Sequence, residues 1–162
     1  MASERPNIIL IMTDQQRFDT IGAWGYDHAI TPAIDRLAVR GVSFRQAYCP
    51  GATCVASRAA IFTGMYAHNT GVYSFQSWGN HRTWVHDLAY SGYHCVNIGK
   101  RHVMPGDLPG GFHERVIVEN PTSRPLLGGG SDDDWGRYLT LHGQERPNDR
   151  HRTDPDWMQR FQ

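Results

Sequence analysis

One stretch, residues 49–64, constrains this chain more than any other part of its sequence. It opens with residues that favour turns, namely Pro50, Gly51 and Thr53. Residues 56–62 then have the composition of a helix, and Gly64 stands where a left-handed residue would end it. The sequence therefore predicts a loop that turns into a helix close to Cys54.

The residues at this loop-to-helix transition combine several groups that suit an oxyanion. The free N–H groups and the dipole at a helix N-terminus attract negative charge, and Cys54 lies at that point. Arg58 follows one helical turn later and can direct its guanidinium back toward Cys54, and Ser57 adds a hydroxyl. The stretch is therefore predicted to hold and attack an oxyanion.

The same residues resemble the signature of the sulfatase family. Residues 54–58 (CVASR), followed by AAIFTG, are similar to the family's Cys-x-Pro-Ser-Arg motif in its variant with Ala at the third position. Three further segments resemble, in the family's order, its opening strand and metal loop, its first helix and its Gly-Lys-x-His element: residues 6–15 (PNIILIMTDQ), 31–37 (TPAIDRL) and 98–102 (IGKRH). Four separate matches in order are far more specific than any one of them.

The resemblance implies a sulfuric ester hydrolase whose nucleophile derives from Cys54. In the family, a separate maturation enzyme oxidises this cysteine to formylglycine (3-oxoalanine), and the hydrated aldehyde attacks the sulfur of a small-molecule sulfate ester. The resemblance gives Cys54, Arg58, Lys100 and His102 catalytic roles. A general acid and further metal ligands lie in a later part of the family's domain.

A divalent cation, Ca²⁺ or else Mg²⁺ or Mn²⁺, is implied by the same resemblance, with Asp14, Gln15 and the residue at position 54 as ligands. Asp14 follows the apolar run of residues 7–12, and its carboxylate is a hard oxygen donor. An isolated Asp after a strand more commonly caps a turn. Gln15 replaces a second Asp of the family pattern, as in relatives that cleave choline sulfate or phosphonate monoesters.

Two further polar segments are candidates for binding the anion. His68 and Asn69 resemble a family segment that lines the anion pocket, although a plain polar loop before Gly71 is an alternative for His68. Lys100 and His102 follow the predicted strand 94–98, at the sheet edge where open α/β folds place their ligands. Arg101, between them, is expected to face solvent.

The pattern of elements predicts an α/β fold. Apolar runs predict strands at residues 7–12, 42–48 and 94–98, and capping residues predict helices at 32–40 and 84–90. The resemblance implies an alkaline-phosphatase-like fold, a mostly parallel sheet sandwiched by helices, here truncated. Residues 1–162 would be the N-terminal part of a single sulfatase-like catalytic domain whose C-terminal part is absent. Residues 135–141 suggest a short helix, and residues 132–134 (DDD) suit a helix cap better than a metal cluster.

Composition excludes several classes of protein. The chain of 162 residues has 16 basic and 16 acidic residues, which gives no reason to expect nucleic acid as a partner. No apolar run approaches the ~20 residues of a membrane span, and the run before Asp14 is too short for a signal sequence, so a cytoplasmic protein is expected. Three cysteines without a second tight pair argue against a disulfide framework or a structural zinc site.

The sequence thus favours a sulfatase and leaves two alternatives. One is a phosphonate monoester or phosphodiester hydrolase of the same superfamily, with which Gln15 and Asn69 are compatible. The other is a fragment without catalytic activity, and the 162-residue chain alone is expected to be inactive. Exposed sheet edges and apolar faces are expected to make it associate into oligomers or aggregates.

Overall fold

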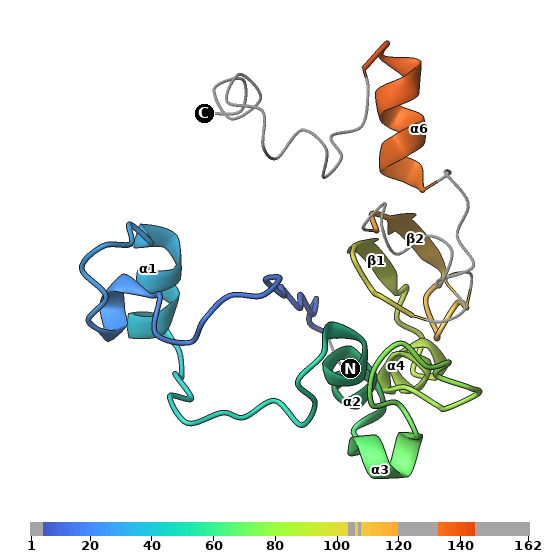
Figure 1. Cartoon of the computed structure of the whole chain (residues 1–162), viewed down its shortest axis with the longest axis horizontal. Helices are drawn as coiled ribbons and strands as arrows, with labels where there is room; N and C mark the ends of the chain where they lie inside the picture. Colours follow the sequence, from blue (N-terminus) through green and yellow to red (C-terminus); the bar gives the residue numbers. More distant parts are fainter. Residues whose placement is uncertain (1–4, 104–105, 107, 120–132, 145–162) are drawn as a thin grey trace. The chain divides into compact units, whose positions relative to one another are not determined.

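The computed structural model describes residues 5–103, 106, 108–119 and 133–144 (Figure 1). The chain divides into two compact units, Met1–Tyr48 and Cys49–Gln162. The loop that precedes Cys54 belongs to the second unit, together with the rest of the chain after it. Asp14 and Gln15 belong to the first unit.

The first unit is built around one helix, α1 (Pro32–Arg40), and the short 3-10 helix η1 (Gly22–Trp24). Thr31 precedes α1 and Gly41 ends it, as the sequence predicts. The Thr31 hydroxyl accepts a hydrogen bond from the Gly22 N–H (2.9 Å) and donates one to Asp35 (2.8 Å). The start of α1 is therefore fastened to η1 by side-chain hydrogen bonds.

The predicted strands at residues 7–12 and 42–48 are wrong, because neither segment is a strand in the structure. An apolar run shows that a segment favours burial, but a strand also needs a second strand to satisfy its N–H and C=O groups. Among the described residues only β1 (Val96–Gly99) and β2 (Glu114–Ile117) form a ladder, and they pair with each other. The apolar side chains of residues 8–11 are accordingly exposed.

The second unit begins with the predicted helix, α2 (Cys54–Thr63). The Thr53 hydroxyl accepts from the Ala56 N–H (3.3 Å), and Gly64 ends the helix in the left-handed region at φ 71°. Ala59 and Phe62 are buried in the core, whereas Ile61 between them in sequence is 41% exposed. Residues from three further parts of the unit complete the hydrophobic core around α2: Val72, Trp78, Val85, Cys95 and Val103.

Two helices contact α2 (Figure 1). The short α3 (Ala67–Thr70) follows it directly, and α4 (Trp84–Tyr90) is the helix predicted from its cap, Thr83. The side chain of His86 accepts a hydrogen bond from the Thr83 N–H (3.1 Å), which fixes the first turn. Val85 is fully buried, so α4 packs its predicted apolar face on the core.

The two strands β1 and β2 lie side by side and are parallel, with Gly99 opposite Ile117 (Figure 1). β1 confirms the strand predicted at residues 94–98, whereas β2 was not predicted. The helix α6 (Asp134–Leu141) contacts β2 and confirms the short helix predicted there. Asp133 caps it by accepting from the Gly136 N–H (2.8 Å), so this part of the acidic run is a helix cap.

The α/β class is therefore confirmed by a parallel strand pair, with α6 packed against β2 and the other helices of the second unit packed on α2. None of the helices in the described ranges is long and apolar enough to cross a membrane.

Candidate active site

Cys54 is the first residue of α2, so its side chain lies at the N-terminal end of that helix. It is half-buried and carries a free thiol. Cys49 and Cys95 are free as well, in agreement with the absence of a disulfide framework. The sequence-based placement of Cys54 at a helix N-terminus is confirmed.

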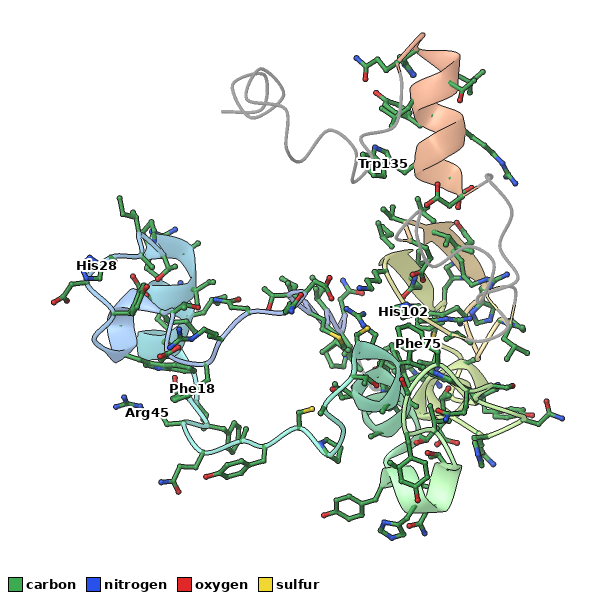
Figure 2. The ribbon with its side chains drawn as sticks, viewed as in Figure 1. Phe18, His28, Arg45, Phe75, His102 and Trp135 are labelled. Atoms are coloured by element: carbon green, nitrogen blue, oxygen red, sulfur yellow. The ribbon has the colours of Figure 1, made fainter. Side chains whose placement is uncertain are left out.

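The imidazole of His102 contacts the Cys54 thiol, although the two residues are far apart in the sequence. Its Nδ1 lies 2.9 Å from the Cys54 Sγ, and the residue is only 3% exposed. The imidazole and the ring of Phe75 make a T-shaped contact, with 5.5 Å between ring centroids; both residues are labelled in Figure 2. His102 has a φ of 58°, in a region that residues other than glycine adopt uncommonly. A particular backbone turn thus brings this imidazole to the thiol.

Arg58 makes a second contact between α2 and the segment after β1. Arg58 is buried at 6% exposure, and its Nη1 donates to the backbone carbonyl oxygen of Lys100 at 2.5 Å. The four residues proposed from the sequence as catalytic thus lie on two segments that touch at two points, Cys54 with His102 and Arg58 with the Lys100 carbonyl. Arg58 also ties α2 to the segment that follows β1. Their roles in catalysis stay predictions.

Arg101 does not face solvent, and that expectation is wrong. It is 5% exposed, and its guanidinium donates to the carbonyl oxygens of Pro109 (2.7 Å) and Leu108. Burial, and to a lesser degree the nearby Arg115, lower the pKa of Arg101 to about 10, while Glu119 opposes this shift. Arg101 is therefore a charged group at neutral pH, held inside the protein by backbone carbonyls.

Glu119 was missed by the sequence analysis. Its Oε1 accepts from the backbone N–H groups of His102 (2.8 Å) and Arg101 (3.2 Å). Continuing the register of β1 and β2 by two residues places Glu119 opposite Arg101. A prediction of β2 would have been needed to find it, because the link is made by strand pairing and not by any local motif.

The remaining candidates are two pairs of exposed residues. His68 and Asn69 are exposed on α3, and the His68 ring stacks on Tyr66 with centroids 5.7 Å apart. Asp14 and Gln15 are exposed in the first unit, and Gln15 adopts a φ of 53°. In the described part of the chain, no three or more His, Cys, Asp or Glu side chains gather in a group able to hold a metal ion.

A pocket of about 230 Å³ opens in the second unit beside Arg101. Aromatic rings form much of its wall, including those of Phe62, Trp78 and Phe112. Neither Cys54 nor His102 lines it, so it is separate from the thiol–imidazole contact.

The chain is similar in sequence to known sulfatases. The chain is 40% identical to an arylsulfatase of Clostridium perfringens over 116 residues, which are 70% of this chain and 24% of that protein. The chain thus spans about a quarter of that relative's length.

Solved structures show the same likeness. A putative sulfatase from Bacteroides thetaiotaomicron superposes with a TM-score of 0.51 at 36% identity, over 64% of this chain and 24% of that one. A phosphonate monoester hydrolase of Agrobacterium radiobacter superposes with a TM-score of 0.65 at 24% identity, over 94% of this chain and 30% of that one, and shares the fold.

The family model described as Sulfatase matches residues 6–138, a range that includes Cys54, Arg58, Lys100 and His102. With that match over most of its length, and with relatives of solved structure that share its fold, the chain belongs to the sulfatase family of the alkaline-phosphatase-like superfamily.

Proposed function

We propose that this chain is the nucleophile-bearing part of a sulfuric ester hydrolase, with formylglycine formed from Cys54. The observation that carries the proposal is the 2.9 Å contact between the Cys54 Sγ and the His102 Nδ1 at the N-terminal end of α2. When formed, the hydrated aldehyde would supply the oxygen that attacks sulfur, and a bound cation would polarise the ester.

The chain's own residues have distinct tasks in this proposal. His102 holds or moves a proton at the atom that occupies the position of the Cys54 Sγ, since its Nδ1 is within hydrogen-bonding distance of that position. The N–H groups at the start of α2 and the side chain of Lys100 bind the negatively charged oxygens of the ester. Arg58 holds the nucleophile's helix against the segment after β1 through its bond to the Lys100 carbonyl.

We further propose that Asp14 and Gln15 are ligands of a divalent cation, together with the residue derived from Cys54. Their carboxylate and amide oxygens are the donor types that Ca²⁺ and Mg²⁺ prefer. Ca²⁺ takes about six to eight oxygen ligands, and these two side chains supply fewer. The described residues alone would therefore bind the cation weakly.

The proposed substrate is a small sulfate ester, by analogy with the arylsulfatase relative. A phosphonate monoester or phosphodiester is the second candidate, because Gln15 removes one negative charge from the proposed metal site relative to a second Asp. His68 and Asn69 stay candidates for substrate binding. A maturation enzyme is the proposed protein partner, because the oxidation of a thiol to an aldehyde needs an oxidant and a catalyst that this chain does not supply.

Peptide mass spectrometry tests the proposal directly. The chain is expressed with and without a formylglycine-generating enzyme, and the peptide containing residues 53–58 is compared between the two preparations. We expect a lower mass only with the enzyme, corresponding to replacement of the thiol by an aldehyde. Fragmentation of the peptide should locate the change at residue 54, while Cys49 and Cys95 stay unmodified. An unmodified Cys54 in both preparations would favour a fragment without this chemistry.

A matured protein that contains this chain together with the later part of the family's domain is then assayed with an aryl sulfate and with an aryl phosphonate monoester. A higher kcat/KM for the sulfate supports the proposed substrate class, and a higher kcat/KM for the phosphonate supports the second candidate. The Cys54→Ala variant, prepared in the same way, measures the background rate for both esters.

A further inference from the structure

The turn that carries His102 is held by a carboxylate from the neighbouring strand. Lys100, Arg101 and His102 follow the carboxyl end of β1, and Glu119 follows the carboxyl end of β2. Because the two strands are parallel, both segments leave the sheet at the same edge. One oxygen of Glu119 accepts from two consecutive N–H groups, those of Arg101 and His102.

These two hydrogen bonds act on a backbone conformation that needs support. A histidine at φ 58° is in the left-handed region, which costs free energy unless the surroundings determine it. Hydrogen bonds from N–H groups to a carboxylate are about twice as strong as those between neutral groups. The Glu119 carboxylate therefore favours the one turn that directs the His102 imidazole toward Cys54.

Glu119 is itself fixed in place. Its own N–H donates to Asp133 Oδ2 (2.9 Å), and the Ile117 N–H donates to Asp134 Oδ2 (2.7 Å). Asp133 is the N-cap of α6, so the start of that helix holds the end of β2. The support of His102 thus extends from α6 through Glu119 to the turn after β1.

We infer that Glu119 is a positioning residue that holds the His102 imidazole against the side chain of residue 54. Its Oε1 accepts from the backbone N–H groups of residues 101 and 102, so it acts through the backbone that carries the imidazole. The role we assign to Glu119 rests on the proposed function, in which residue 54 becomes the nucleophile. Its test, however, needs only the unmodified thiol.

The experiment measures the alkylation of Cys54 by iodoacetamide in protein expressed without a maturation enzyme. Cys49, which is exposed, serves as the internal reference in each sample. In the Glu119→Ala variant we expect the rate at Cys54 relative to Cys49 to fall, because the imidazole no longer stays within hydrogen-bonding distance of the thiol and cannot take its proton, and the thiolate is the form that iodoacetamide alkylates. We also expect loss of the nuclear Overhauser contact between the His102 Hε1 and the Cys54 Hβ protons.

Glu114→Ala is the matched control, because Glu114 lies on β2, the strand that Glu119 follows, but pairs with the exposed His94. It should leave both the rate ratio and the Overhauser contact unchanged. A folded Glu119→Ala protein that keeps the ratio and the contact of the unaltered chain would overturn the inference.

If Glu119→Ala does not fold, Glu119→Gln decides in its place, since the amide keeps an acceptor oxygen and loses only the charge. A smaller but measurable fall in the ratio supports the role, and an unchanged ratio with the contact retained overturns it. A failed conversion of Cys54 to formylglycine would count against the proposed function alone, because neither readout here depends on that conversion.

Discussion

Arg58 shows how one side chain can serve both the fold and the site. Its guanidinium is buried and donates to the Lys100 carbonyl, so the residue links α2 to the end of β1. Hydrogen bonds from charged groups contribute about 1.5–3 kcal/mol to stability. We therefore expect Arg58→Ala to lower the free energy of unfolding by about 2–3 kcal/mol, measured by urea denaturation followed by circular dichroism.

Arg82→Ala is the control for this prediction, because Arg82 pairs with Asp87 on the surface, with both side chains more than half exposed. Exposed ion pairs contribute less than about 1 kcal/mol, so this variant should unfold close to the unaltered chain. Equal losses from the two variants would contradict the structural role of Arg58. A loss of turnover in Arg58→Ala alone does not separate catalysis from stability.

Arg101 shows which properties of a single residue could not be predicted from the local sequence. Local sequence identified Cys54, Arg58, Lys100 and His102, because each belongs to a short motif with a defined spacing. It gave the wrong environment for Arg101, whose charge is satisfied by the backbone carbonyls of Leu108 and Pro109, seven and eight residues further along the chain. Burial of this kind depends on tertiary contacts, which no local pattern encodes.

At the level of elements, substitutions at two glycines can distinguish the cost of backbone strain from the cost of disturbing close packing. Gly64 at the end of α2 and Gly111 before β2 both have a left-handed φ, of 71° and 93°. A Cβ at Gly64 would meet nothing within 4 Å, whereas one at Gly111 would lie 2.6 Å from the backbone nitrogen of His86 in α4. Gly64→Ala therefore tests φ alone, and Gly111→Ala tests φ together with the approach of the loop to α4.

We expect Gly64→Ala to lower the free energy of unfolding by about 1–2 kcal/mol, the cost of a left-handed residue with a Cβ. Gly111→Ala should cost a further 1–3 kcal/mol or so, because the loop must move away from α4. Urea denaturation of both variants gives the difference. If the two losses are equal, the loop does not lie against α4 as described.

The helices were more predictable than the strands for a physical reason. A helix satisfies its own backbone, and the caps Thr31, Thr53 and Thr83 mark where α1, α2 and α4 begin. A strand depends on a partner distant in sequence. The apolar run of residues 7–12 has strand composition without a ladder, and β2 forms a ladder although its sequence, ERVI, gave no signal.

At the level of the whole molecule, the exposed apolar surface is the feature with the clearest consequence. Four consecutive side chains in the first unit, Ile8, Ile9, Leu10 and Ile11, are each more than half exposed. Soluble monomers rarely present contiguous apolar surface on this scale, since water favours its burial against another surface. The chain is therefore expected to associate with itself in solution as its concentration rises.

Sedimentation velocity over a range of protein concentrations tests this expectation. Replacing Ile9 and Ile11 together by Thr should shift the distribution toward monomer, because those two side chains are 82% and 80% exposed and lie within the continuous run. The free energy of unfolding of this variant should stay within about 0.5 kcal/mol of that of the unaltered chain, as is usual for surface substitutions.

Val39→Thr with Val42→Thr is the matched control, because both valines are 81% exposed but lie outside the run. An equal shift in the control would mean that association follows total apolar exposure, and no shift in either would show that the run does not drive association.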